Sequence, residues 1–287
     1  MGIRSMSENM EANYFRRRLI DKFMYSLLAS ATLVAVLPLF SIFIYITYRG
    51  INALNFDFFT QIPKPIGETG GGLANSLIGS ALLTSLASLL GVPWGIGLGL
   101  YLSEYGEGLW PKIIRFCTDL LSSVPSILIG LFVLEIMVSP MRHFSAYAGG
   151  LALALIMIPI VARTTEELLR MVPHHVREAG LALGLPRWRV TLFIILKGSR
   201  KGIVTALMLA VARISGETAP LLFTSFNNQY WSVNLNEPIS SLPIQIYTYA
   251  ISPFEEWQRQ AWAGALVLVL FVFLVNGLIR FILKSKD

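Results

Sequence analysis

Charged residues are scarce in this sequence. Only 14% of its 287 residues are Asp, Glu, Lys or Arg, whereas a soluble domain carries about 25%. Hydrophobic residues make up 54% of the chain, and its mean hydropathy is +0.62. A soluble protein would need a very large core to bury this apolar excess, and the uncharged runs are too long for such a core. The shortage of charge therefore indicates an integral membrane protein.

Residue types that carry chemistry are also few. The single cysteine, Cys117, excludes an internal disulfide framework. The three histidines have no cysteines or suitably spaced carboxylates around them that would favour a metal site. The sequence contains no Gly-x-x-x-x-Gly-Lys-Ser/Thr motif, so the chain lacks the phosphate-binding loop of an ATPase. We therefore expect no catalytic residue, no metal and no cofactor in this chain.

Long uncharged runs predict an all-α, polytopic membrane protein with six transmembrane helices. The fifth run is interrupted only by Arg213 and Glu217. The first run spans about 26 residues, which exceeds the 7–15-residue apolar core of a signal peptide and favours an uncleaved anchor. The six approximate ranges are 23–48, within 69–103, 116–138, 146–162, 201–224 and 260–279.

The charge distribution predicts how the chain crosses the membrane. Eighteen of the 23 Lys and Arg residues fall before the first run, between the second and third, between the fourth and fifth, or after the sixth. Only four fall in the other connecting segments, and Arg213 lies inside the fifth run. The positive-inside rule then places both termini in the cytoplasm and explains the net charge of +6 without a nucleic-acid partner. We expect a cytoplasmic tail over 1–22, a transmembrane domain over 23–283 with a cytoplasmic loop at about 163–200, and a C-terminal tail over 284–287.

The loop at about 163–200 has the pattern of two short helices joined at a glycine. Pro173 suits the first turn of a helix, and Gly184 suits the left-handed position just past its end. Pro186 can then begin a second helix. An ordinary amphipathic loop is the alternative interpretation of this pattern alone.

The same stretch resembles the Glu-Ala-Ala loop of ABC-importer permeases. That pattern is Glu-Ala-Ala, three residues, Gly, nine residues, Ile, one residue and Leu-Pro. Gly180 replaces the second Ala, and Lys197 replaces the final Pro. The resemblance implies a coupling helix that docks in a cleft of a separate ATPase subunit. The matching positions in this sequence are Glu178, Ala179, Gly180, Gly184, Ile194 and Leu196.

Two charges lie deep in the fifth run. Arg213 is about 12 residues past Lys201, or about 18 Å into an apolar layer about 30 Å thick, and Glu217 follows four residues later on the same helix face. Each charge costs about 2.5–3.5 kcal/mol at a helix centre, so we expect this face to contact protein or water. Pro220 predicts a kink beside Glu217.

Two interpretations of this pair remain open. It is either a structural ion pair or part of a substrate pathway, in which the guanidinium binds phosphate or another tetrahedral oxyanion through two parallel hydrogen bonds. Glu217 would then either hold Arg213 in place or accept the proton of hydrogen phosphate.

The segment around this pair resembles one family closely. Arg213-x-x-Gly-Glu217-Thr218-Ala-Pro220-Leu-Leu-Phe-Thr looks like span 5 of the phosphate-specific ABC permeases, particularly the A-type subunits. The resemblance extends from about residue 73 to the C-terminus. Further matches are Tyr101-Leu-Ser-Glu104-Tyr105, Ser123-Val-Pro125-Ser-Ile-Leu-Ile-Gly130, Ser241-Leu-Pro243-Ile-Gln-Ile-Tyr247 and Ala261-Trp262.

This resemblance implies the type I ABC-importer permease fold and ATP-driven import of inorganic phosphate across a bacterial cytoplasmic membrane. It places Arg213, Glu217 and Thr218 on the substrate pathway. The implied partners are a related C-type permease in a heterodimer, two copies of an ATP-binding subunit, an external phosphate-binding protein and the surrounding lipid. The C-type subunit itself, or a permease for another oxyanion, is the alternative.

Two further features complete the prediction. Gly91, Gly95 and Gly99 recur every four residues, which favours close helix packing over a substrate role. The outer segment 225–256 contains no Lys or Arg, and it is either a contact for the binding protein or a polar cap.

Overall fold

The computed structural model describes residues 2–65, 68 and 70–284. The chain divides into two units, residues 1–49 and 50–287, which are described separately. The predicted C-terminal tail lies outside the described residues except for Lys284. Helices account for all the regular structure among the described residues, as the predicted all-α class requires.

The first unit is one long helix, α1 (Gly2–Gly50). Its apolar stretch is the predicted first span, and its hydroxyl side chains bond back to their own helix. Ser26 donates to the Lys22 carbonyl at 2.6 Å, and Thr32 donates to the Leu28 carbonyl at 2.8 Å. These bonds satisfy polar groups that lipid could not, so the hydroxyl groups are compatible with a membrane-spanning helix.

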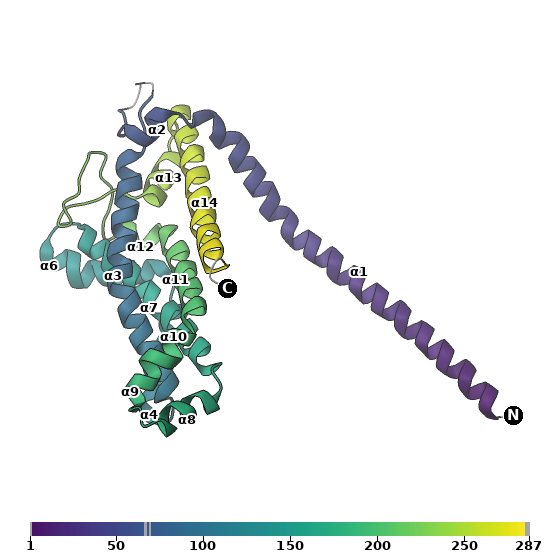
Figure 1. Ribbon diagram of the computed structural model, residues 1–287. Helices are drawn as coiled ribbons and strands as arrows, with labels where there is room; N and C mark the ends of the chain where they lie inside the picture. The colour runs from purple at the N-terminus through teal and green to yellow at the C-terminus, as the bar shows by residue number, and fades with distance from the viewer. Residues whose placement is uncertain (1, 66–67, 69, 285–287) are drawn as a thin grey trace. The chain divides into compact units, whose positions relative to one another are not determined.

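The second unit is built around two continuous helices, α3 (Ala74–Glu104) and α7 (Ala146–Arg170), which we call the spine. A Cβ atom at Gly95 would come within 2.7 Å of the Val161 side chain, and one at Gly99 within 2.6 Å of Thr165. These glycines therefore allow the two backbones to approach closely, as the four-residue repeat predicted. The remaining helices of the unit surround the spine (Figure 1).

The third predicted span is not one helix. The chain forms α4 (Leu109–Ser123) and then α5 (Ser126–Val133), a π-helical turn (Leu134–Val138) and α6 (Ser139–Met141), with a bend of 103° after α4. The expectation of a continuous helix over 116–138 is therefore wrong. Pro125 explains the break, because a residue before proline is driven out of the helical region and Val124 is extended, with φ −66° and ψ 130°.

The fifth predicted span is also interrupted. Helix α11 (Arg200–Ser215) ends at Gly216, and the four-residue helix α12 (Ala219–Leu222) follows. The predicted kink at Pro220 is thus a full break that begins one turn earlier, so the range 201–224 is not a single helix. Helix α12 packs on α5, since a Cβ atom at Gly130 would come within 2.6 Å of Pro220 Cα. The two broken spans, α4–α5 and α11–α12, therefore meet through α5 and α12, the helices that follow their breaks.

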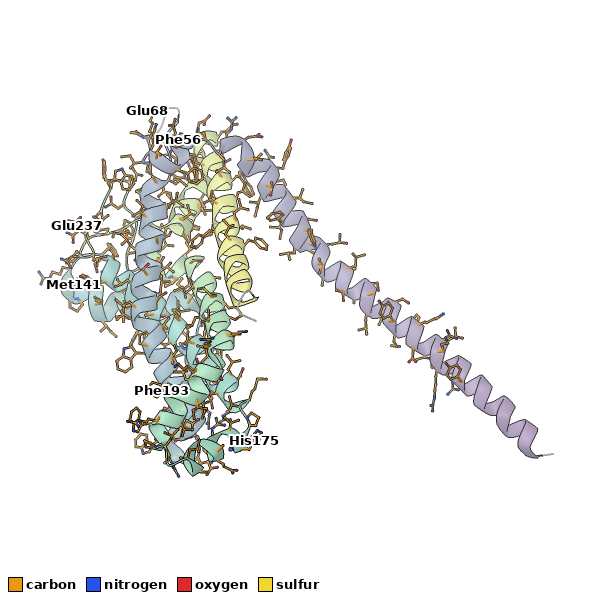
Figure 2. All side chains as sticks on the ribbon, in the orientation of Figure 1. Phe56, Glu68, Met141, His175, Phe193 and Glu237 are labelled. Atoms are coloured by element: carbon orange, nitrogen blue, oxygen red, sulfur yellow. The ribbon has the colours of Figure 1, made fainter. Side chains whose placement is uncertain are left out.

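Short helices lie toward both ends of the second unit (Figure 1). Helix α2 (Phe56–Thr60) and helix α13 (Leu242–Ala250) lie toward one end, and α8 (His174–Ala182) and α9 (Arg187–Arg189) lie at the other (Figure 1). His175 and Phe193 mark the second end in Figure 2, and Phe56 and Glu68 mark the first. The last helix, α14 (Glu255–Lys284), starts at the α13 end, where Trp257 stacks on Tyr249 with ring centroids 4.6 Å apart.

Four described helices are long and apolar enough to cross a membrane, or five if the bent pair α4–α5 counts as one span. They correspond to the predicted first, second, fourth and sixth spans, with the bent pair as the third. Helix α11 has only 16 residues, so the predicted number of six transmembrane helices is not confirmed by length alone.

The outer segment between α12 and α13 is fixed to the end of α7. Backbone N–H groups of Ser145, Ala146 and Tyr147 donate to the carbonyls of Thr224, Glu237 and Leu235 at 3.1–3.2 Å. The Ser145 hydroxyl accepts from Ala148 N at 3.2 Å. This segment is therefore an ordered cap on the spine.

Candidate functional site

The predicted helix-Gly-helix corner is present at the α8–α9 end. Helix α8 follows Pro173, Gly184 has a φ of +77°, and Pro186 precedes α9, which continues into a π-helical stretch (Val190–Ile195) and α10 (Leu196–Gly198). The Leu185 N–H donates to the Gly180 carbonyl at 3.3 Å and thereby closes the turn. Because a positive φ strains any residue with a side chain, glycine suits position 184. We call residues 173–198 the coupling corner.

The residues that match the Glu-Ala-Ala loop have two different environments. Glu178 and Ala179 are exposed on α8. Gly180 is buried, and a Cβ atom there would come within 2.9 Å of Val190 and 3.2 Å of Ile194. Ile194 and Leu196 pack on the apolar cluster beneath the corner, which contains Leu169, Val190, Ile195 and Ile203. The matched residues thus divide into an exposed pair and a buried group that shapes the corner.

Arg177 attaches the coupling corner to the spine. Its Nε and Nη2 lie 3.2 and 3.1 Å from Glu104 Oε1, at the end of α3. It also donates to the carbonyl of Leu169 at 2.9 Å and to that of Val172 at 2.7 Å, at the end of α7. Sequence reasoning counted Arg177 only as a basic residue. No local signal could pair it with a carboxylate 73 positions away, although Glu104 belongs to one of the quoted matches.

A hollow that charged and apolar residues line together lies beside this contact. Its volume is about 240 Å³, and Arg177, Glu178, Leu181 and Arg187 are among the residues that line it. Exposed Glu178 therefore faces a concave surface with charges of both signs, which suits contact with a polar partner surface.

The charged pair of the fifth span lies at the end of α11. Arg213 Nε is 3.9 Å from Glu217 Oε1, and the two side chains are 60% and 16% exposed. The pairing predicted from the four-residue spacing is confirmed, although Glu217 lies beyond the helix end and the contact is long. Thr218 follows in the break and is partly buried. The break thus places Glu217 and Thr218 directly after the helix that carries Arg213.

Arg213 points away from the interior of this chain. A cavity of about 360 Å³ is lined by α3 hydroxyl residues such as Ser80 and Thr84, and by Val211 and Ser215 of α11. Arg213 lies two positions from each of these α11 residues, and therefore on the opposite face of the helix. Its guanidinium is thus presented at the surface of the chain.

Among the described residues, no three His, Cys, Asp or Glu side chains form a group that could hold a metal ion. The arrangement consists instead of an exposed guanidinium beside a helix break and an exposed corner with charges of both signs at one end of the fold. Broken helices at membrane depth expose backbone groups, which is tolerated only beside protein or a water-filled path. Such an arrangement is typical of a membrane transporter.

The family comparison defines the class more closely. Residues 91–286 match the family described as binding-protein-dependent transport system inner membrane component. Because the match covers more than half of the chain, the chain belongs to this family. It is a multi-pass membrane protein and a permease component of an ABC importer.

Several relatives are phosphate transport permeases. The chain is 51% identical to the phosphate transport system permease protein PstA of Yersinia pestis over 83% of this chain and 81% of that protein. It is 45% identical to PstA of Haemophilus influenzae over 98% of this chain and all of that protein. A probable PstA of Methanocaldococcus jannaschii is 37% identical over 94% of this chain and 95% of that protein.

Solved structures support the fold. A bacterial ABC transporter involved in the import of the acidic polysaccharide alginate aligns with a TM-score of 0.64 and 16% identity, covering 92% of this chain and 99% of that chain. An inward-facing MetNI methionine ABC transporter aligns with a TM-score of 0.58 and 16% identity over 74% and 93%. At this identity the likeness concerns the fold alone, which is that of ABC-importer permeases.

Proposed function

We propose that this chain is a permease subunit that imports inorganic phosphate, driven by ATP hydrolysis in a separate subunit. The observation that carries the proposal is the 45% identity with a phosphate transport system permease over 98% of this chain and the whole of that protein. The substrate is part of this proposal because the sequence similarity covers Arg213 and the helix break beside it.

The pathway runs past Arg213, Glu217 and Thr218. The exposed guanidinium supplies a fixed positive charge and a planar donor pair that suits a phosphate oxygen pair. Glu217, at 3.9 Å, holds Arg213 in place until the anion arrives. Because Arg213 lies on the surface of this chain, a second permease subunit encloses the pathway from the other side. We propose a heterodimer with a related C-type permease, supplied by an extracytoplasmic phosphate-binding protein.

The coupling corner receives the ATPase. Glu178 and Ala179 are exposed there, while Gly180, Gly184, Ile194 and Leu196 fix the shape of the corner. Two copies of an ATP-binding subunit serve the two permeases. The charge asymmetry of eighteen to four supports a cytoplasmic position for this end and for both termini, in a bacterial inner membrane.

Uptake by cells tests the proposal. Cells depleted of this chain should lose high-affinity phosphate uptake and keep sulfate uptake, and the wild-type chain should restore the loss. Loss of sulfate uptake instead would indicate a permease for another oxyanion. Purification of the chain with two ATPase subunits and a different permease chain would support the assembly, whereas a pair of identical chains would contradict the heterodimer.

A further inference from the structure

Arg115 and Glu166 form a buried ion pair between α4 and α7, near the coupling corner. Arg115 Nε lies 2.7 Å from Glu166 Oε1, and the glutamate side chain is only 2% exposed. Arg170 Nη2 reaches the same oxygen at 2.9 Å, and Arg163 Nη1 lies 3.7 Å from Oε2. A buried carboxylate is stable only when it is paired, so this contact fixes α4 to the spine.

Arg115 also binds the end of the other spine helix. Its Nη2 donates to the Leu102 carbonyl at 2.9 Å, and its Nη1 donates to the Gly106 carbonyl at 3.1 Å. One guanidinium therefore joins the end of α3, the turn before α4, and α7. A lysine could not direct donors to three such separate acceptors through one planar group.

The coupling corner is attached to the same two helix ends. Arg177 bonds to Glu104 of α3 and to the carbonyls of Leu169 and Val172 at the end of α7. Arg115 and Arg177 thus attach two different segments, α4 and the corner, to one short region of the spine. A displacement of the corner that moves this region must also move α4, as long as both contacts hold.

Helix α4 leads directly to the broken spans. It ends at the Val124–Pro125 break, and α5 beyond the break packs at Gly130 against Pro220 of α12. Helix α12 in turn follows the break that holds Glu217 and Thr218. A continuous set of contacts therefore runs from the coupling corner to the break beside Arg213.

We propose that Arg115 and Glu166 are positioning residues that make α4 follow the coupling corner, so that movement imposed by the ATPase reaches the broken spans. Neither residue touches the substrate. The inference rests on the proposed function, because it assumes an ATPase that acts on the corner and an anion that passes Arg213.

Proteoliposomes that hold the complete importer test this role, with phosphate uptake and ATP hydrolysis measured together. Glu166→Gln keeps an oxygen acceptor and nearly the same volume but removes the charge. Hydrolysis stimulated by the phosphate-loaded binding protein should persist, while the phosphate moved per ATP falls about tenfold, within the usual range of coupling between sites. Glu167→Gln is the matched control, because Glu167 is 67% exposed and, among the described residues, its ion pair is with Arg163 at 3.7 Å. It should leave both rates unchanged.

A wild-type ratio of phosphate to ATP in Glu166→Gln would overturn the inference while the proposed function stands. Failure of the wild-type complex to move phosphate would instead contradict the proposed function.

A second measurement tests whether α4 moves with the coupling corner, and it does not depend on the assembly of the Glu166→Gln variant. Cys117, the single cysteine, is exposed on α4 two residues after Arg115, and Leu183 is 80% exposed in the coupling corner. Spin labels on Cys117 and on Leu183→Cys, with cysteine-free partner subunits, report whether α4 and the corner move together. The expected distance is the same in the nucleotide-free and ATP-bound complexes. A distance that changes between these states would overturn the proposal.

Discussion

The spine and the broken spans differ in how they cross the apolar layer. The two spine helices, α3 and α7, run without interruption. Glycines of α3 allow the backbones of the two helices to approach closely. The α4–α5 and α11–α12 segments break where a proline follows, and they place Glu217 and Thr218 at a break. Dense packing resists deformation, whereas a break concentrates conformational freedom in a few residues. We therefore expect the spine to determine stability and the broken spans to carry the proposed path.

The largest expected effect is the loss of transport on changing Arg213 in the broken span. Arg213→Gln keeps a polar side chain but removes the charge and the guanidinium. Loss of about 3 kcal/mol of charged hydrogen bonding corresponds to about a hundredfold lower phosphate uptake, with the membrane level of the complex near normal.

Combining this change with Glu217→Gln separates the two interpretations of the pair. A structural ion pair predicts that each single change lowers the amount of complex and that the double change restores both assembly and uptake. A pathway role predicts a double mutant that assembles and still fails to move phosphate. Full recovery of uptake in the double mutant would contradict the pathway role.

A change in the spine should act on the amount of protein instead. Gly99→Ala brings a Cβ atom within 2.7 Å of the Ala162 carbonyl, which belongs to the backbone and cannot turn aside. Overpacking of this kind costs about 1–3 kcal/mol, so the amount of folded complex should fall several-fold. Gly97→Ala is the control on the same helix, because among the described residues no atom lies within 4 Å of its Cβ position. Equal yields of the two variants would contradict the spine's role.

The contact between α5 and α12 should give an intermediate result. Gly130→Ala brings a Cβ atom within 2.6 Å of Pro220 Cα and forces α5 away from α12. We expect a smaller loss of complex than for Gly99→Ala, because these short helices can shift, and a larger loss of uptake per assembled complex. The measurement is uptake normalised to the amount of permease in the membrane. A loss of protein with normal uptake per complex would mean that this contact stabilises the fold, as the spine contacts do.

The smallest expected effect concerns Gly184 in the coupling corner. Gly184→Ala meets no described atom within 4 Å, so its cost is the backbone strain of a φ of +77°, about 1–2 kcal/mol. The corner should shift, and stimulated ATP hydrolysis should fall a few-fold while the permease still inserts. Gly198→Ala, where φ lies outside the positive range and the surroundings are also open, is the matched control. Normal hydrolysis in Gly184→Ala would contradict the coupling role of the corner.

Local sequence patterns predicted the parts of this fold that depend on neighbouring residues. The positions of Gly184 and Pro186 gave the corner, and the repeat at Gly91, Gly95 and Gly99 gave the packing of the spine. The break at Pro125 was missed although its signal is present, because a largely apolar run, with only Asp119 and Glu135 as charges, was read as one helix. Charge spacing alone cannot reveal such a bend.

Contacts between distant parts of the chain could not be predicted. Arg115 and Glu166 are 51 positions apart, and their pairing depends on how α4 lies against α7. The exposure of Arg213 likewise depends on which face of α11 packs on the spine. From the sequence alone, Arg115, Glu166 and Arg213 could be recognised only as charged residues.

The cap on α7 has a consequence for how an anion approaches the protein. A free helix N-terminus attracts phosphate because its first four N–H groups lack partners. In α7 these four donors, from Ser145 to Ala148, are all occupied by three carbonyls and the Ser145 hydroxyl. The N-terminus of α7 therefore offers an arriving anion no competing trap. In the proposed pathway, retention of phosphate on its way inward is left to Arg213, whose fixed charge is carried on an exposed side chain from which an anion can be released.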